Sequence, residues 1–142
     1  MPASALAHNT NRAPPGAEWK IQNMLADPQS LTLSQGAKTA ARVLTGTTRG
    51  RFVAPDGTAT LEVETDGTAN RQRTIVRMVD QKVAADPLTA VMQKVSASAT
   101  LTINRPLATF TEAEVVSLVA GLTTWLTAGT NANLKKVIGG EN

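Results

Sequence analysis

The hydrophobic pattern of the chain changes its period once, at Pro106. Over residues 19–105, apolar and polar residues alternate with a period of two, and turn residues separate the alternating runs. After Pro106, apolar residues recur at the three- and four-residue spacing of one helix face. A period of two is typical of half-buried β-strands, and a period near 3.6 is typical of amphipathic helices. The sequence therefore predicts an α+β chain in which an antiparallel meander sheet comes first and helices come last.

Turn residues divide the alternating region into short and long runs. The turn Pro55-Asp56-Gly57 joins two short runs into a predicted hairpin. The expected short strands cover residues 30–33, 41–44, 51–54 and 58–65, and the expected long strands cover residues 71–79 and 95–103. Because proline cannot donate to a strand ladder, Asp86-Pro87 predicts that residues 80–89 form a loop.

The C-terminal region carries a helix start signal and two helix stop signals. Thr111 and Glu114 have the spacing of a capping box, in which each side chain bonds the backbone N–H of the other residue. Gly129 stands where helices commonly end on a left-handed glycine. We therefore expect a first helix that begins after Thr111 and a second, shorter helix over residues 131–138 that ends at Gly139-Gly140.

The first predicted helix has one apolar face, and the chain has few large side chains with which to build a core. Aromatic residues make up only 3% of the 142 residues. Small side chains bury less apolar area each, and small domains often gain the missing burial by association. We expect the helices to cover the apolar face of the sheet. The helix stripe comprises Val115, Leu118, Val119, Leu122, Trp125 and Leu126.

The length and composition indicate one domain and exclude several kinds of chemistry. Residues 1–18 show no period and predict an N-terminal arm, which leaves residues 19–142 as the domain. The chain has no cysteine and one histidine, so neither a thiolate nor a histidine-based metal site is expected, nor is a nucleophilic triad. No apolar run has the length of a membrane-spanning helix. The sequence thus predicts a protein that is not an enzyme, needs no cofactor or metal, and has no membrane partner.

Strict alternation places the charged residues of three predicted strands on the face opposite the apolar one. In a first interpretation this face is simply wet, as in any half-buried antiparallel sheet, and Glu62 and Glu64 neutralise neighbouring arginines. In a second, the net charge of +3 and the two-residue spacing of cations indicate binding to nucleic-acid phosphates. The polar positions are Thr60, Glu62 and Glu64, then Arg71, Arg73 and Arg77, then Lys94, Ser96, Ser98 and Thr100.

Several segments, taken in order, resemble the coat proteins of single-stranded RNA bacteriophages, the levivirus coat protein family. The resemblance runs from Ile21 to Asn142 and rests on their succession in a strands-then-helices chain. It includes the Pro-Asp-Gly-Thr turn, the run Arg-Gln-Arg-Thr-Ile-Val-Arg and the C-terminal Lys-Lys-Val-Ile-Gly-Gly-Glu. The segments are residues 21–27, 55–58, 61–63, 71–77, 82–89, 100–106, 125–128 and 135–141.

The resemblance implies a particular architecture and a set of partners. An N-terminal β-hairpin would precede a five-stranded antiparallel meander sheet, and two C-terminal helices would pack on a partner subunit, which would bury the stripe from Val115 to Leu126. Homodimers would form an icosahedral shell, expected to be T=3, around single-stranded genomic RNA, with a phage maturation protein as a further partner. The protein would be made in the cytoplasm of a bacterial host and would reside in the virion.

The resemblance also implies roles for two groups of residues. RNA contacts in the family come from the inward positions of the middle and last strands. At two of these positions Glu62 and Glu64 stand where relatives often carry Ser, Thr or Arg, and the chain has no tyrosine to stack on a loop base. We therefore expect general phosphate binding rather than recognition of one hairpin. The corresponding RNA-binding residues are Thr60, Arg71, Arg73, Arg77, Lys94, Ser96, Ser98 and Thr100. The loop between the two long strands would join dimers at the symmetry axes through Gln81, Lys82, Asp86 and Pro87.

Two other classes of function fit the same pattern. A dimeric sheet protein could bind RNA and repress translation without forming shells. Another self-assembling phage component, such as a tail-tube subunit, could share the strands-then-helices order. The three classes differ in the particle that they form: a closed shell, a stable dimer or an open tube.

Overall fold

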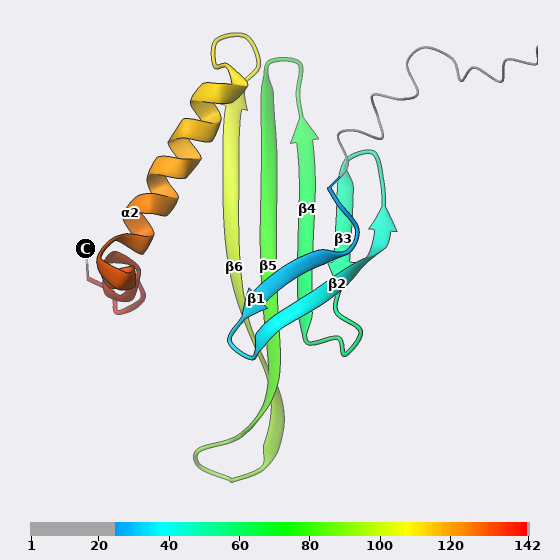
Figure 1. The fold of residues 1–142 in the computed structure, drawn as a ribbon, viewed down its shortest axis with the longest axis vertical. Coiled ribbons are helices and arrows are strands. Elements are labelled where there is room, and N and C mark those ends of the chain that lie inside the picture. The colour runs from blue at the N-terminus through cyan, green and yellow to red at the C-terminus, as the bar shows by residue number, and fades with distance from the viewer. Residues whose placement is uncertain (1–24, 142) are drawn as a thin grey trace, which may run out of the picture.

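A computed structural model describes residues 25–141, and the predicted arm, residues 1–18, lies outside the described residues. Six strands form one antiparallel sheet in which the strand order follows the chain, and one helix follows them (Figure 1). The elements are β1 (Gln29–Leu33), β2 (Gly36–Thr45), β3 (Arg49–Val53), β4 (Ala59–Gly67), β5 (Arg71–Ala85), β6 (Met92–Pro106) and α2 (Glu112–Ile138). The α+β class and the meander are therefore confirmed.

The strand count differs from the expected hairpin plus five further strands because β2 belongs to both the hairpin and the sheet. Its first half pairs with β1, and its second half pairs with β3. The register shifts between Arg42 and Leu44, so Val43 is an extra residue in β2. Such a bulge bends a strand and increases its twist. The bend folds the β1–β2 hairpin back over one face of the sheet.

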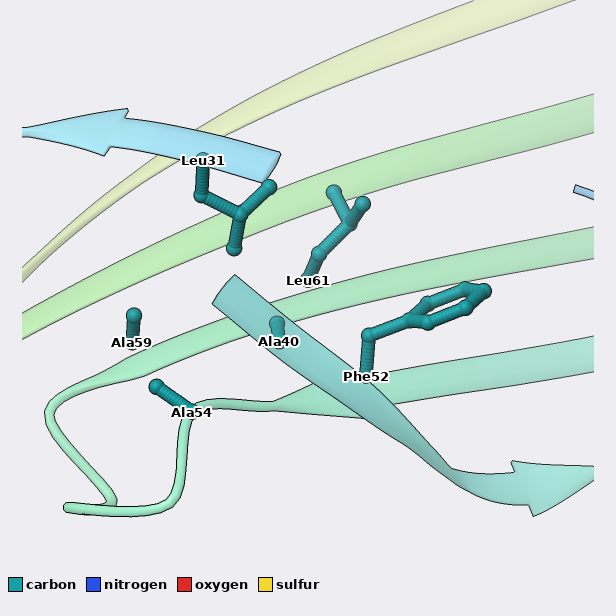
Figure 2. Close-up of a cluster of buried hydrophobic side chains, with 6 residues drawn as sticks. All are labelled: Leu31, Ala40, Phe52, Ala54, Ala59 and Leu61. Atoms are coloured by element: carbon teal, nitrogen blue, oxygen red, sulfur yellow. The ribbon is translucent and has the colours of Figure 1, made fainter. Parts of the chain in front are cut away.

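The hairpin covers the apolar face of β3 and β4 and forms the core there. Leu31 of β1 and Ala40 of β2 lie against Phe52 and Leu61, and Ala54 and Ala59 complete the cluster (Figure 2). Phe52 is fully buried. The expectation that only the helices would cover this face is wrong, because the period of the short N-terminal strands does not reveal which way the hairpin folds.

Polar contacts fix the position of the hairpin on the sheet. The backbone N–H and the hydroxyl of Ser34, at the hairpin tip, both donate to the carboxylate of Asp80 in β5. The amide of Gln35 donates to the same carboxylate at 3.2 Å. Hydrogen bonds from Ser34 lower the pKa of Asp80. On β2, Lys38 lies 2.6 Å from Asp56 of the β3–β4 turn, and this hydrogen bond, with two from Thr58, holds the pKa of Asp56 far below its usual range.

The two long strands extend further than the sequence pattern indicated. Strands β5 and β6 are 15 residues each and pair without interruption from Arg71 opposite Pro106 to Ala85 opposite Met92. The predicted loop over residues 80–89 is therefore wrong in extent, because only residues 86–91 connect the strands. Gln81 and Lys82 lie in β5, where cross-strand pairing with Ser96 and Val95 continues the ladder. Asp86 and Pro87 lie in the turn, as expected.

The helix begins as predicted and breaks in the middle. Thr111 and Glu114 form the capping box, and hydrogen bonds from Thr111 lower the pKa of Glu114. The backbone leaves helical geometry over residues 128–131, where Gly129 has a φ of 59°. The two expected helices are thus one element with an internal break, held together by a hydrogen bond from the Asn133 side chain to the Trp125 carbonyl at 2.8 Å. No residue of α2 is buried.

Candidate nucleic-acid interface

The strand register brings all the predicted RNA-binding residues to one face of the sheet. Glu62 of β4 lies opposite Arg77 of β5, which in turn lies opposite Thr100 of β6. Positions two residues apart share a face. The polar face therefore carries Thr60, Arg71, Arg73, Arg77, Lys94, Ser96, Ser98 and Thr100 on the side away from the β1–β2 hairpin. The expected division of the sheet into an apolar face and a polar face is found in the structure.

One member of this set is poorly placed for the predicted contact. Thr60 is only 8% exposed, and it lies between Val53 of β3 and Val79 of β5 in the register. Its hydroxyl therefore offers little surface to a ligand as large as RNA. The sequence pattern placed Thr60 on the correct face, but it did not reveal that apolar neighbours flank it there.

The carboxylates of the polar face pair with arginines that the sequence analysis did not single out. Arg49 lies 2.5 Å from Glu64, and Arg51 lies 3.3 Å from Glu62, both across the β3–β4 ladder. The hydrogen bond that Arg49 donates to Glu64 raises the pKa of Arg49, and the charge of Glu64 acts in the same direction. The two-residue spacing of Arg49 and Arg51 was the signal in the sequence that could have predicted these pairs.

The polar face is consequently divided into a neutral part and a cationic part. On β3 and β4, two arginines and two glutamates compensate each other. Among residues 25–141, none of the remaining cations of this face has a carboxylate within ion-pair distance. We call these four residues, Arg71, Arg73, Arg77 and Lys94, the cationic strip. The first interpretation of the face, in which Glu62 and Glu64 neutralise their neighbours, holds for β3 and leaves the cationic strip uncompensated.

Between the two parts, the polar face is hollowed. The hollow has a volume of about 380 Å³ and is lined by Glu62 and Glu64 of β4, Ile75 and Arg77 of β5, and Ser98 and Thr100 of β6. We call it the β4–β6 hollow. It brings together three predicted RNA-binding residues and both carboxylates. Arg71, Arg73, Lys94 and Ser96 lie outside it, along the same two strands.

The predicted association stripe lies uncovered on α2. Leu118 is 68% exposed, Leu122 is 46% exposed and Trp125 is 53% exposed, whereas Val115, Val119 and Leu126 are half-buried. Four of the six residues line an apolar groove of about 180 Å³ between α2 and β6. Strand β6 is also the last strand of the sheet, so its outer edge has no partner among the described residues. Helix α2 starts beside the C-terminal end of β6 and then diverges from it (Figure 1), and the groove joins the stripe to residues 101–106 of β6. We call the stripe and the outer edge of β6 together the α2–β6 surface.

The turn between β5 and β6 presents apolar side chains at its tip. The Asp86 carboxylate accepts hydrogen bonds from the backbone N–H groups of Leu88 at 2.8 Å and Thr89 at 3.3 Å, which fix the shape of the turn. Leu88 is 96% exposed, and Val91 and Met92 are each 63% exposed. Exposed apolar side chains therefore lie beside Asp86 and Pro87, the turn residues expected to contact other dimers, although the hydrophobic pattern did not single them out.

The described part of the chain contains neither a cluster of metal-ligating residues nor a helix suited to crossing a membrane. Residues 25–141 bring together no group of three or more His, Cys, Asp or Glu side chains that could hold a metal ion. Within the same range, no helix combines the length and hydropathy needed to cross a membrane.

Comparisons with known proteins identify the fold. No protein-family model matches the sequence, and no curated protein sequence matches it. Among solved structures, the virus-like particle of bacteriophage AVE019 superposes with a TM-score of 0.70 at 21% identity, covering 84% of this chain and 98% of that one. The virus-like particle of Beihai levi-like virus 21 gives 0.60 at 18% identity, covering 81% and 94%. The bacteriophage GA capsid protein gives 0.51 at 14% identity, covering 80% and 95%. These likenesses show that the chain has the overall fold of these phage particle proteins, with a six-stranded sheet and one broken helix in place of the expected five-stranded sheet and two helices.

Proposed function

We propose that the chain is a structural capsid protein, without enzymatic activity, whose homodimers assemble into an icosahedral shell around single-stranded RNA. The observation that carries the proposal is the uncovered α2–β6 surface on a chain with the fold of virus-like particle proteins. An isolated soluble domain rarely leaves so large a contiguous apolar surface exposed to water. The proposed location is the virion of a phage made in a bacterial cytoplasm.

The α2–β6 surface supplies the energy for a homodimer. Two copies of β6 pair edge to edge in the proposed dimer, and each α2 crosses onto its partner. The unpaired outer edge of a 15-residue strand is a ready template for such pairing. Burial of a large apolar side chain such as Leu118, Leu122 or Trp125 contributes about 1.5–3 kcal/mol each. Four to six such residues from each copy account for a stable dimer.

The polar face supplies the attraction to RNA. The cationic strip follows β5 and β6 along one face, and its four charges are free to replace counterions on phosphates. Hydroxyls of Ser96, Ser98 and Thr100 lie beside the strip and can donate to phosphate and sugar oxygens. In the proposed shell this face points inward, toward the genome.

The tip of the β5–β6 turn supplies contacts between dimers. Leu88 and Val91 are exposed in this turn, whose shape is fixed by Asp86, and Met92 is exposed at the adjoining start of β6. In the proposed shell these side chains, with Pro87 in the turn and Gln81 and Lys82 on the adjoining strand, meet their copies at the symmetry axes. A T=3 arrangement and a phage maturation protein as a further partner belong to the same proposal.

Size-exclusion chromatography followed by electron microscopy of the full-length protein tests the proposal. Closed shells of megadalton mass that contain RNA are the expected result. A stable dimer that never forms particles would favour the translational repressor, and open tubes would favour another assembling phage subunit. A monomer in solution would contradict all three.

A further inference from the structure

We propose that the β4–β6 hollow is a guanine site, which binds an unpaired guanine of the RNA held on the polar face. The inference rests on the proposed function, because it presumes RNA at this face. It goes beyond the general phosphate binding that the sequence favours, since it names the base that the hollow selects.

The hollow has the size and the mixture of side chains of a small-ligand site. Its volume of about 380 Å³ lies within the range of about 300–1,000 Å³ that such pockets span. Ile75, opposite Glu64 in the register, supplies an apolar surface for the face of a base. Arg77 and the hydroxyls of Ser98 and Thr100 complete the lining on the side of the cationic strip. One base therefore finds an apolar contact, hydrogen-bonding groups and one cation, Arg77, within one hollow.

The ion pairs on β3 make the carboxylates compatible with RNA. Arg49 and Arg51 each contact the Oε1 atom of their glutamate, at 2.5 Å and 3.3 Å. The second carboxylate oxygen, Oε2, of Glu62 and of Glu64 has no hydrogen-bond partner among residues 25–141. Since a carboxylate can accept about four hydrogen bonds, each keeps free capacity. The two arginines compensate the negative charge that would otherwise repel a phosphate backbone.

The chemistry of a free carboxylate edge selects guanine. The Watson–Crick edge of guanine has two adjacent donors, N1–H and the N2 amino group, which match the two oxygens of a carboxylate or the two lone pairs of one of its oxygens. Cytosine and adenine each offer one amino group next to a ring nitrogen that accepts, and uracil offers one N–H between two carbonyls. These acceptors would face the carboxylate and repel it. Unpaired bases are the ones whose Watson–Crick edges proteins can read in this way.

Single-stranded oligonucleotides with one variable base test the site. We would measure the affinity of the full-length protein for otherwise uridine-only 12-mers that carry guanine, adenine, cytosine or inosine at the centre. Guanine should bind roughly 10-fold more tightly than adenine, cytosine or uracil, as a bidentate base contact does. Inosine keeps N1–H but lacks the amino group, so the inosine 12-mer should bind more weakly than the guanine 12-mer and more tightly than the other three.

Two charge-matched variants isolate the carboxylates. Glu62→Gln with Glu64→Gln should abolish the guanine preference while binding to the all-uridine 12-mer stays equal or becomes tighter, because two negative charges leave the face. Glu112→Gln with Glu141→Gln removes the same charge from elsewhere in the chain and should keep the preference. Circular dichroism and gel filtration verify that both variants fold as the parent does.

The results separate this inference from the proposed function. Equal affinity for all four bases, or a guanine preference that survives in the Glu62→Gln, Glu64→Gln variant, would overturn the guanine site and leave RNA binding intact. Failure to bind any of the oligonucleotides would overturn the RNA-binding role itself. A guanine preference that is lost only in the first variant supports the site.

Discussion

Removal of the arginines of the cationic strip should weaken RNA binding by an amount that can be calculated. Arg71, Arg73 and Arg77 lie on one face of β5, and none of them has an ion-pair partner among residues 25–141. Each is therefore counted as one phosphate contact. For single-stranded nucleic acid, the slope of log K against log salt changes by about 0.7 for each such contact. Replacing all three with Gln should thus reduce the slope by about 2 and lower the affinity roughly 100-fold at 0.1 M salt.

The assay is fluorescence anisotropy with a labelled single-stranded RNA at several salt concentrations between 0.05 and 0.3 M. Lys135→Gln with Lys136→Gln is the control, because it removes two positive charges from the last turn of α2 and none from the strands of the polar face. The control should change the slope by less than the value of about 0.7 that one phosphate contact contributes, since neither lysine belongs to the strands of the polar face. Particles assembled from the triple variant should also contain less RNA than those of the parent.

An unchanged slope in the triple variant would refute the reasoning. It would mean that the polar face does not meet phosphates and that the face is only solvated, as in the first interpretation of the sequence. An equal reduction of the slope in the lysine control would show instead that the net charge of the protein, and not the position of the cationic strip, governs binding.

Three further perturbations test other parts of the structure. Leu122→Asp places a charge in the α2–β6 surface and should yield a monomer or an aggregate by gel filtration; a soluble dimer of normal stability would contradict the proposed interface. Phe52→Ala empties the core under the β1–β2 hairpin and should cost about 3–5 kcal/mol in denaturant unfolding, whereas a loss below about 1 kcal/mol would show that the hairpin does not pack there. Asp80→Asn should lower the melting temperature at neutral pH. Because the folded state lowers the pKa of Asp80, the stabilisation is present above the ordinary aspartate pKa and is lost as the pH falls through the lowered value. The melting temperatures of parent and variant should therefore converge at strongly acidic pH. A difference in melting temperature that stays constant with pH would exclude the Asp80 contacts as its source.

Local signals in the sequence predicted those features that depend on neighbouring residues. The capping box at Thr111 and Glu114, the left-handed Gly129 and the turn at Pro55-Asp56-Gly57 are set by short-range hydrogen bonding and by allowed backbone angles. The division of β4, β5 and β6 into an apolar and a polar face follows from strict alternation. These predictions needed no knowledge of which strands pair.

Errors arose where the outcome depended on a contact between distant segments. The loop over residues 80–89 was predicted from Pro87 alone, yet pairing with β6 carries β5 to Ala85. Thr60 has the pattern of an exposed residue but is covered by its neighbours on β3 and β5. Arg49 and Arg51 were not predicted as partners of Glu64 and Glu62, because only the register of β3 against β4 places each arginine opposite its glutamate.

The sequence by itself determined the α+β class, the order of the elements, the helix start and the face on which each strand residue lies, because all of these follow from periods and caps within a few residues. Only the tertiary structure decided that the β1–β2 hairpin covers the apolar face, that Glu62 and Glu64 neutralise β3 and leave the cationic strip free, and that α2 stands uncovered beside β6. The physical reason is that the bend at the β2 bulge and the register of the strand ladders determine which side chains from distant parts of the sequence come into contact. A pattern within a few residues carries no information about either.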